Sequence, residues 1–252
     1  MTIETLTRRV QPPAPPAPGH AALFLDLDGT LAPIVDRPQD VAPDPRRTSL
    51  LDGLAAALDG RLAVVSGRTL CDIDRILENR VIAVAAIHGL VRRDSTGAVT
   101  ETGGHAGLPA ALEALRAFAR RDPRLLVEDK GPSVTLHYRM APDLSEPAKA
   151  EARQVAAQTG LVLQPGDMVA ELRTPGPSKG DSVKAFMREP PFIGATPIFV
   201  GDDLTDEHGF AAAIELGGYG VLVGCSRASA ARYCIPDVAA ALDWLESWRC
   251  PA

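Results

Sequence analysis

Short apolar runs alternate with amphipathic stretches from Ala21 onward, and this alternation limits what the chain can fold into more than any other feature. The runs "ALFLD", "RLAVVSGR" and "VIAVAAIHG" have the length of buried strands, and helical stretches such as "RRTSLLDGLAAALDG" and "TLCDIDRILEN" separate them. Strands that alternate with helices in this way build βαβ units, whose strands lie parallel in one sheet. The sequence therefore predicts an α/β core built on a parallel sheet.

The middle of the chain follows a different pattern. Two helical stretches, "LPAALEALRAFARRDP" and "SEPAKAEARQVAAQTG", are interleaved with alternating stretches such as "SVTLHYRM" and "MVAELRT". Alternation with period two is typical of half-buried antiparallel strands, so we predict a small α+β unit, preceded by a hairpin around 95–97. We expect a disordered proline-rich tail over 1–20, a core formed by 21–106 and 175–252, and an inserted domain over 107–174.

The composition excludes several classes of partner. The 252 residues are 46% hydrophobic and 23% charged, as in an ordinary globular protein with a sizeable core. A formal net charge of −6 argues against nucleic acid and anionic membranes, although it leaves room for a small anionic substrate bound by local charge. Because we find no run of membrane-spanning length and no signal-peptide pattern, we expect a cytoplasmic protein with no membrane partner.

The four cysteines carry no metal-binding pattern. Cys71, Cys225, Cys234 and Cys250 form no CxxC pair and show no zinc-type spacing. We interpret them as reduced or incidental thiols of a cytosolic protein, with a surface disulfide near the C-terminus left open as the alternative.

Two carboxylates, Asp26 and Asp28, follow the first predicted strand in "FLDLDGTLAPI". Gly29 after them indicates a turn, because glycine reaches backbone angles that other residues avoid. Both carboxylates should therefore lie at the C-terminal end of a strand, where open α/β sheets bind their ligands. An aspartate-capped turn explains this stretch equally well when it is taken alone.

Reactive groups recur at other predicted strand ends and helix starts. They are Asp26 and Asp28 in "DLDGT", Ser66 and Arg68 in "VVSGR", Lys179 in "PSKGD", and Asp202, Asp203 and Asp206 in "GDDLTDE". The carboxyl ends of parallel strands converge, so we expect these groups to share one crevice. Each stretch alone is explained by a cap, a surface lysine or an acidic turn, whereas their joint order makes those explanations improbable.

That order of motifs resembles the haloacid-dehalogenase (HAD) superfamily of phosphotransferases. The resemblance covers most of residues 21–248 and implies a Rossmann-like HAD core with an inserted α+β cap domain that sets substrate specificity. It also implies Mg²⁺ as cofactor, held by Asp26, Asp28, Asp202 and Asp203. Such a hard cation neutralises a phosphate ester and its attacking carboxylate, which would otherwise repel each other.

The resemblance also implies catalytic roles. Asp26 would attack phosphorus and form an aspartyl-phosphate, and Asp28 would protonate the leaving oxygen and then deprotonate water. Ser66 and Lys179 would hold phosphoryl oxygens. We expect Asp206 to cap the helix that follows it.

Within that superfamily the sequence is similar to the trehalose-6-phosphate phosphatases. The similarity rests on "SGR", the "HG" pair at 88–89, "VEDKGPSVTLHYR" and "AELRTPGPSKGDSV". It implies that Glu128, Lys130 and Glu171 contact the sugar, with Arg68, His88 and Arg173 nearby. Val91 departs from the family pattern, in which an acid often follows the "HG" pair. We interpret His137 as a packed residue outside the site.

The resemblance implies a small sugar phosphate as substrate, specifically trehalose 6-phosphate, and a functional link to a trehalose-6-phosphate synthase. Two alternatives stay open at this point. One is another sugar phosphatase on the same core, of the sucrose-phosphate or mannosyl-phosphoglycerate type or a phosphomannomutase-like protein. The other is a non-catalytic sugar-phosphate sensor, against which the complete set of Asp26, Asp28, Lys179 and Asp202 argues.

Overall fold

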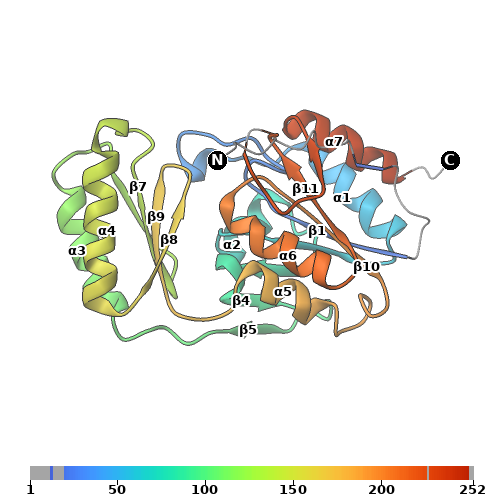
Figure 1. Cartoon of the computed structure of the whole chain (residues 1–252), viewed down its shortest axis with the longest axis horizontal. Coiled ribbons are helices and arrows are strands. Elements are labelled where there is room, and N and C mark those ends of the chain that lie inside the picture. The colour runs from blue at the N-terminus through green and yellow to red at the C-terminus, as the bar shows by residue number, and fades with distance from the viewer. Residues whose placement is uncertain (1–11, 14–19, 226, 250–252) are drawn as a thin grey trace, which may run out of the picture. The chain divides into compact units, whose positions relative to one another are not determined.

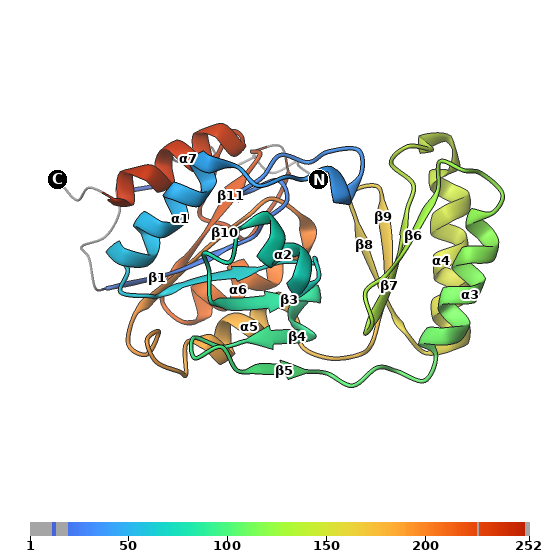
Figure 2. The same ribbon diagram turned by 180° about the vertical axis from the view of Figure 1, so that it is seen from behind.

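The computed structural model describes residues 12–13, 20–225 and 227–249, so the predicted tail lies almost wholly outside the described residues. The chain divides into two compact units, one assigned to residues 1–99 and 178–252 and the other to residues 100–177. The second unit contains the whole of the insertion predicted over 107–174 and extends a few residues beyond it at both ends. Figures 1 and 2 show the two units from opposite sides.

A mostly parallel sheet forms the centre of the first unit. Within the described residues it has eight strands in the order β12–β11–β10–β1–β2–β3–β4–β5. These strands are β1 (Ala21–Leu25), β2 (Leu62–Val65), β3 (Ala83–Ala86), β4 (Val91–Arg93), β5 (Val99–Glu101), β10 (Thr196–Gly201), β11 (Tyr219–Val223) and β12 (Tyr233–Ile235). The strands from β12 to β3 pair in parallel, and β4 turns antiparallel to β3. The parallel core predicted from the sequence is confirmed.

Helices cover both faces of this sheet. They are α1 (Pro45–Ala57), α2 (Leu70–Ile76), α5 (Lys179–Phe186), α6 (Glu207–Glu215) and α7 (Val238–Glu246), with short 3₁₀ turns η1 (Pro38–Asp40), η2 (Ile87–Gly89), η4 (Leu204–Asp206) and η5 (Ser247–Arg249). Successive side chains of β1 point to opposite faces. Leu23 and Leu25 pack in the cluster under α1, α2 and α7, whereas Phe24 packs in the cluster under α5 and α6. This two-sided burial explains why β1 is apolar throughout.

The second unit packs two helices on one face of an antiparallel sheet (Figure 1). All its residues are described, and its four strands have the order β6–β7–β9–β8. Its elements are β6 (Leu126–Asp129), β7 (Ser133–His137), β8 (Val162–Gly166), β9 (Val169–Arg173), α3 (Leu108–Ala119), α4 (Ser145–Thr159) and the turn η3 (Pro142–Leu144). At the base of this unit the backbone N–H of His105 donates to Thr174 Oγ1 at 3.1 Å, which ties the incoming chain to the outgoing chain.

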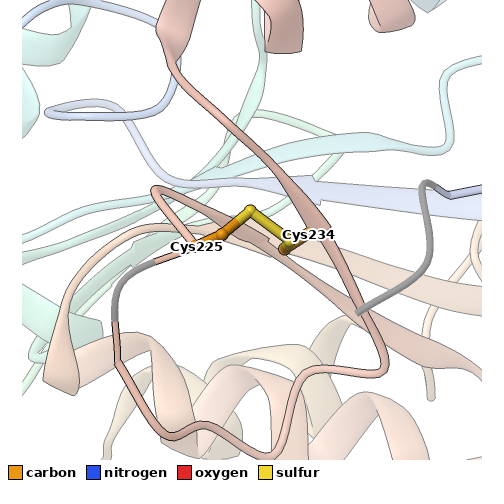
Figure 3. The surroundings of a disulfide bond; sticks show 2 residues. All are labelled: Cys225 and Cys234. Carbon is orange, nitrogen blue, oxygen red and sulfur yellow. A yellow bond between two sulfur atoms is a disulfide. The ribbon is translucent and has the colours of Figure 1, made fainter. Parts of the chain in front are cut away.

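Cys225, just after β11, and Cys234, in β12, form a disulfide (Figure 3). Our expectation of reduced thiols is wrong for this pair, and the alternative of a disulfide near the C-terminus holds. The reason is topological: β11 and β12 are paired neighbours, so the loop between them returns one cysteine to the other. Cys71 is an exposed free cysteine, and Cys250 lies outside the described residues.

None of the helices in the described part of the chain is long and apolar enough to cross a membrane.

Candidate active site

Three adjacent parallel strands bring the predicted groups of the core together. Asp26 follows β1, Ser66 follows β2 and Asp202 follows β10, and β1 pairs with β10 on one side and β2 on the other. From β1 the chain continues to β2 and returns only later to β10, so the β1–β10 boundary is the point where the strand order reverses. Ligands of open α/β sheets bind at this position.

A buried ion-pair cluster occupies this strand end. Lys179 Nζ donates to Asp26 Oδ1 at 2.9 Å and to Asp206 Oδ1 at 2.6 Å. Lys179 is the first residue of α5, and the side chain of Ser178 caps that helix by accepting the N–H of Asp181. The cap fixes where the helix begins and therefore where Lys179 points. Burial alone lowers the pKa of the Lys179 ammonium, but the charges of Asp206 and Asp26 outweigh burial and raise it.

Asp206 has a different role from the helix cap that the sequence suggested. Its Oδ2 accepts the backbone N–H groups of Asp202 at 2.9 Å and Asp203 at 3.0 Å, while its Oδ1 accepts from Lys179. At the start of α6 the Asp206 side chain makes no capping hydrogen bond. The prediction fails because the carboxylate turns back to its own loop, where a buried ammonium and two N–H groups outcompete the helix end.

The acidic residues of this strand end fit a divalent cation. Asp26, Asp202 and Asp206 each offer one carboxylate oxygen within 4.8 Å of the others. Asp202 Oδ1 is buried and has no hydrogen-bond partner within the described residues. A Cβ at Gly29, whose φ is +75°, would lie 2.1 Å from Asp202 Oδ2, so only glycine lets the two loops approach. In proteins Mg²⁺ and Ca²⁺ bind hard oxygen ligands that lie close together, and a buried oxygen without a hydrogen-bond partner is a suitable ligand.

The predicted ligand Asp203 is not part of this group of oxygens. Its side chain accepts the backbone N–H of Asp206 and caps η4. Asp206 Oδ1 accepts from Lys179 and its Oδ2 accepts two backbone N–H groups, so Asp26 and Asp202 have more lone pairs left for a cation than Asp206 has. The assignment of Asp203 as a ligand stays a prediction.

Burial and mutual repulsion raise the pKa of these acids. Burial, followed by the charge of Asp206, raises the pKa of Asp202 to about 7. The same two causes raise the pKa of Asp26, against the opposing charge of Lys179. Burial likewise raises the pKa of Asp203. A bound cation reverses such shifts because it supplies the missing positive charge.

Asp28 is paired with Arg68 in this structure. Arg68 Nε and Nη2 donate to the two carboxylate oxygens of Asp28, both at 2.7 Å, and Arg68 Nη1 donates to the carbonyl of Pro38 at 2.8 Å. Such a two-point pair fixes the orientation of the carboxylate as well as its charge. Arg68, predicted to lie near the sugar, therefore orients the predicted general acid.

Ser66 and His88 lie on the neighbouring loops. Ser66 Oγ accepts the backbone N–H of Arg68 at 3.3 Å, and the Ser66 carbonyl accepts the N–H of His88 at 2.9 Å. His88 is buried with a φ of 56°, and a Cβ at Gly67 would lie 2.5 Å from its Nε2. The structure thus brings Ser66, Arg68 and His88 together behind the ends of β2 and β3.

A polar face of the second unit holds the other predicted residues. Strand pairing aligns Glu128, Thr135, Glu171 and Gln164 in one row across β6, β7, β9 and β8. Residues two apart on a strand share a face, so Lys130, His137 and Arg173 lie on the same face as this row. Val127, Leu136 and Leu172 point to the other side and pack in the core of the unit.

An ion pair and hydrogen bonds connect the side chains of this polar face. Glu171 Oε2 accepts from Lys130 Nζ at 3.1 Å and from Thr135 Oγ1 at 3.3 Å. Glu128 Oε2 lies 2.8 Å from His137 Nε2. Burial alone raises the pKa of Glu128, but the hydrogen bond from His137 and the charge of Lys130 outweigh it and lower the pKa. His137, interpreted from the sequence as a packed residue outside the site, belongs to this network, and its alternation with Thr135 was the signal for it.

Carboxylates and a buried lysine lie at the converging ends of parallel strands, and an α+β unit is inserted in the chain. These features define a phosphoryl-transfer enzyme of the α/β class. Comparison with known proteins narrows this class. The family model described as trehalose-phosphatase matches residues 24–238. The trehalose-6-phosphate phosphatase of Escherichia coli is 38% identical over 233 residues, which are 89% of this chain and 85% of that protein. This chain belongs to the trehalose-phosphatase family.

Solved structures agree with the fold. The C-terminal domain of trehalose-6-phosphate phosphatase from C. albicans superposes with a TM-score of 0.83 at 22% identity, covering 96% of this chain and 99% of that domain. A trehalose-6-phosphate phosphatase related protein superposes with a TM-score of 0.74 at 26% identity, covering 89% of this chain and 95% of that one.

Proposed function

We propose that the protein hydrolyses trehalose 6-phosphate to trehalose and inorganic phosphate. The observation that carries this proposal is the buried cluster in which Lys179 joins Asp26 to Asp206 at the strand-order reversal, within a chain of the trehalose-phosphatase family. A buried carboxylate beside a fixed ammonium is suited to meet a phosphate dianion, because the ammonium reduces the repulsion between the two anions.

Two displacements at phosphorus complete the reaction. In the first, an Asp26 carboxylate oxygen forms a bond to phosphorus while the bond to the sugar oxygen breaks, and Asp28 gives its proton to that leaving oxygen. In the second, Asp28 takes a proton from water, whose oxygen bonds to phosphorus while the Asp26–phosphorus bond breaks. Lys179 and Ser66 hold the phosphoryl oxygens, and Arg68 keeps the Asp28 carboxyl oriented.

We propose Mg²⁺ as the cofactor, held by the carboxylates of Asp26 and Asp202 and the backbone carbonyl of Asp28, with Asp203 as a further candidate. When bound, the ion supplies positive charge that lets the Asp26 carboxylate approach the phosphate. The buried, unpartnered Oδ1 of Asp202 supports this assignment.

The second unit is the proposed specificity domain. A disaccharide presents many hydroxyl groups, which carboxylates can accept from and cations can donate to. Glu128, Lys130 and Glu171 offer both kinds of group on one rigid sheet face, and Arg173 lies on the same face. His88 and Arg68 are proposed to lie near the substrate from the core. A synthase that makes trehalose 6-phosphate would supply the substrate, and we place both reactions in the cytoplasm.

Phosphate release tests the proposal directly. The purified protein is given trehalose 6-phosphate, sucrose 6-phosphate or glucose 6-phosphate with Mg²⁺, and p-nitrophenyl phosphate serves as a general phosphatase substrate. We expect turnover of trehalose 6-phosphate at least about tenfold above the other two sugars in kcat/KM, loss in EDTA and return with added Mg²⁺. Equal or higher turnover of sucrose 6-phosphate would move the assignment to another sugar phosphatase, and no release from any ester would favour the sensor.

A further inference from the structure

A loop closed by a disulfide lies beside the acidic strand end. It connects β11 to β12, and the Cys225–Cys234 bond joins its two ends across a separation of nine residues (Figure 3). The bond holds the two ends of this loop together. Arg227 lies within the loop.

Arg227 binds the backbone of the proposed metal ligands. Its Nε and Nη2 donate to the carbonyl oxygen of Asp202 at 3.2 and 3.1 Å, and Nη2 donates to the carbonyl oxygen of Asp203 at 2.6 Å. The rigid fork of a guanidinium can hold two neighbouring acceptors at once, which a lysine ammonium does less well. The two carbonyl groups are therefore fixed relative to each other.

Glu207, the first residue of α6, fixes Arg227 in turn. Its Oε1 accepts from Arg227 Nη1, and its Oε2 accepts the backbone N–H of Ala230 at 2.8 Å. One carboxylate thus ties both the arginine and the backbone of the loop to the start of a helix. This contact is partly buried, since the side chains of Arg227 and Glu207 are 23% and 27% exposed.

The acidic turn is held from two directions. Asp206 accepts the N–H groups of Asp202 and Asp203, and Arg227 donates to the carbonyl groups of the same two residues. The peptide groups on both sides of the Asp202 side chain are thereby immobilised. A carboxylate whose backbone is fixed in this way keeps its oxygen aimed at one place, which is how neighbouring groups tune a metal ligand.

We propose that Arg227 is a positioning residue for the metal-binding carboxylate of Asp202, and that the Cys225–Cys234 disulfide anchors the loop that presents it. This inference rests on the proposed function, because it concerns the Mg²⁺ that the proposed reaction uses. Arg227 touches neither substrate nor reacting atoms; it acts through the Asp202–Asp203 turn.

Calorimetric titration of the metal-free protein with Mg²⁺ tests the inference, beside thermal unfolding and the Mg²⁺ dependence of trehalose 6-phosphate hydrolysis. We expect Arg227→Gln to weaken Mg²⁺ binding by about 10- to 100-fold, the usual effect of removing a group that orients a metal ligand. At saturating Mg²⁺ the variant should recover most of kcat. Arg227→Lys should restore part of the affinity, since it keeps the charge and loses the fork.

Arg232→Gln is the matched control from the same loop, because the Arg232 guanidinium lies over the Tyr233 ring at 5.4 Å and its removal should leave Mg²⁺ affinity unchanged. The double change Cys225→Ser and Cys234→Ser should weaken Mg²⁺ binding in the same direction but less than Arg227→Gln. Glu207→Gln provides a second route to the same loss if Arg227→Gln fails to fold.

Wild-type Mg²⁺ affinity in folded Arg227→Gln or in Glu207→Gln would overturn the inference. Equal losses in Arg227→Gln and Arg232→Gln would also overturn it, because a general effect on the loop would then explain both. The proposed function fails separately: a wild-type protein that binds Mg²⁺ but releases no phosphate would refute the phosphatase activity, while a lower Mg²⁺ affinity of Arg227→Gln would still support the positioning role.

Discussion

The acidic strand end of the first unit and the polar face of the second unit both collect charged side chains, but they balance charge differently. In the first unit three carboxylates, from Asp26, Asp202 and Asp206, lie close together, and the ammonium of Lys179 pairs with two of them, Asp26 and Asp206. On the polar face of the second unit Glu171 pairs with Lys130, and Glu128 contacts His137. The first region has an excess of negative charge, whereas on the second the carboxylates of Glu128 and Glu171 share one face with the cations of Lys130 and Arg173.

This difference separates two kinds of site. Excess negative charge in a buried place raises carboxylate pKa values, as at Asp202, and is relieved by a bound cation. A balanced network is stable without a ligand, and the pKa shift of Glu128 within it has the opposite sign. The first region is therefore suited to charge-driven chemistry. The second is suited to exchanging internal hydrogen bonds for those of a neutral, hydroxyl-rich molecule.

The largest effect is expected from a substitution of the proposed nucleophile in the first region. Asp26→Asn should reduce kcat by at least about a thousandfold, or roughly 4 kcal/mol in barrier, because an amide is a far poorer nucleophile than a carboxylate. Stopped phosphate-release assays on trehalose 6-phosphate and p-nitrophenyl phosphate measure the change. Even a tenth of the wild-type rate would exclude Asp26 as the nucleophile.

The second effect concerns stability. Asp206→Ala removes one partner of buried Lys179 together with the acceptor of two backbone N–H groups, so we expect a loss of about 3–5 kcal/mol in the free energy of unfolding. Urea denaturation of the metal-free protein measures this loss. Asp243→Ala is the control: its ion pair with Arg46 is exposed, and its removal should change stability by less than about 1 kcal/mol. Similar losses in the free energy of unfolding of both variants would mean that the buried contacts of Asp206 stabilise the fold no more than an exposed ion pair does.

A smaller effect sharpens the contrast between the two regions. Glu171→Ala should lower kcat/KM for trehalose 6-phosphate by roughly tenfold to several hundredfold, about 1.4–3 kcal/mol for a lost charged hydrogen bond. Hydrolysis of p-nitrophenyl phosphate should stay nearly unchanged, because this ester lacks the sugar. Glu113→Ala, at an exposed position of α3, is the matched control in the same unit. Parallel losses on both esters would remove Glu171 from sugar recognition.

The smallest expected effect is in the pH dependence. Since the pKa of Asp202 is raised to about 7 in the metal-free protein, Mg²⁺ must displace a proton below that pH. Its affinity should fall by up to about tenfold per pH unit below 7. The raised pKa also means that the folded state holds this proton longer than the unfolded state, so the metal-free protein should lose stability as pH rises from the ordinary value of 3.8 toward 7.

Glu128 should show the opposite sign, because its lowered pKa contributes stability that is lost only as pH falls below its ordinary value of 4.5. Mg²⁺ titrations between pH 5.5 and 7.5, and thermal unfolding of Asp202→Asn and Glu128→Gln, separate the two. A pH-independent Mg²⁺ affinity would contradict the charge excess of the first region.

How far sequence reasoning reached also differs between the regions. Asp26, Asp202 and Lys179 were predictable because strand ends of a parallel sheet converge, whatever the details of the loops. The hydrogen-bond partners of Asp206 were not predictable, because only the folded chain decides whether its carboxylate accepts from a helix end or from a buried ammonium. The Arg68–Asp28 pair and the Arg227 contacts join residues far apart in sequence, which no local pattern reveals. In the second unit alternation gave the shared face, whereas the partner of His137 depended on strand register.

The hydrogen bond between His105 and Thr174 has a consequence for how such proteins change over time. The two segments that connect the second unit to the rest of the chain are hydrogen-bonded to each other. The ends of the unit are therefore held close together by a contact within the unit itself. Modules with adjoining ends can be exchanged between chains at little cost in loop closure. The unit can therefore be exchanged at this pair of segments, and if it recognises the sugar as proposed, such an exchange would change which sugar phosphate the protein accepts.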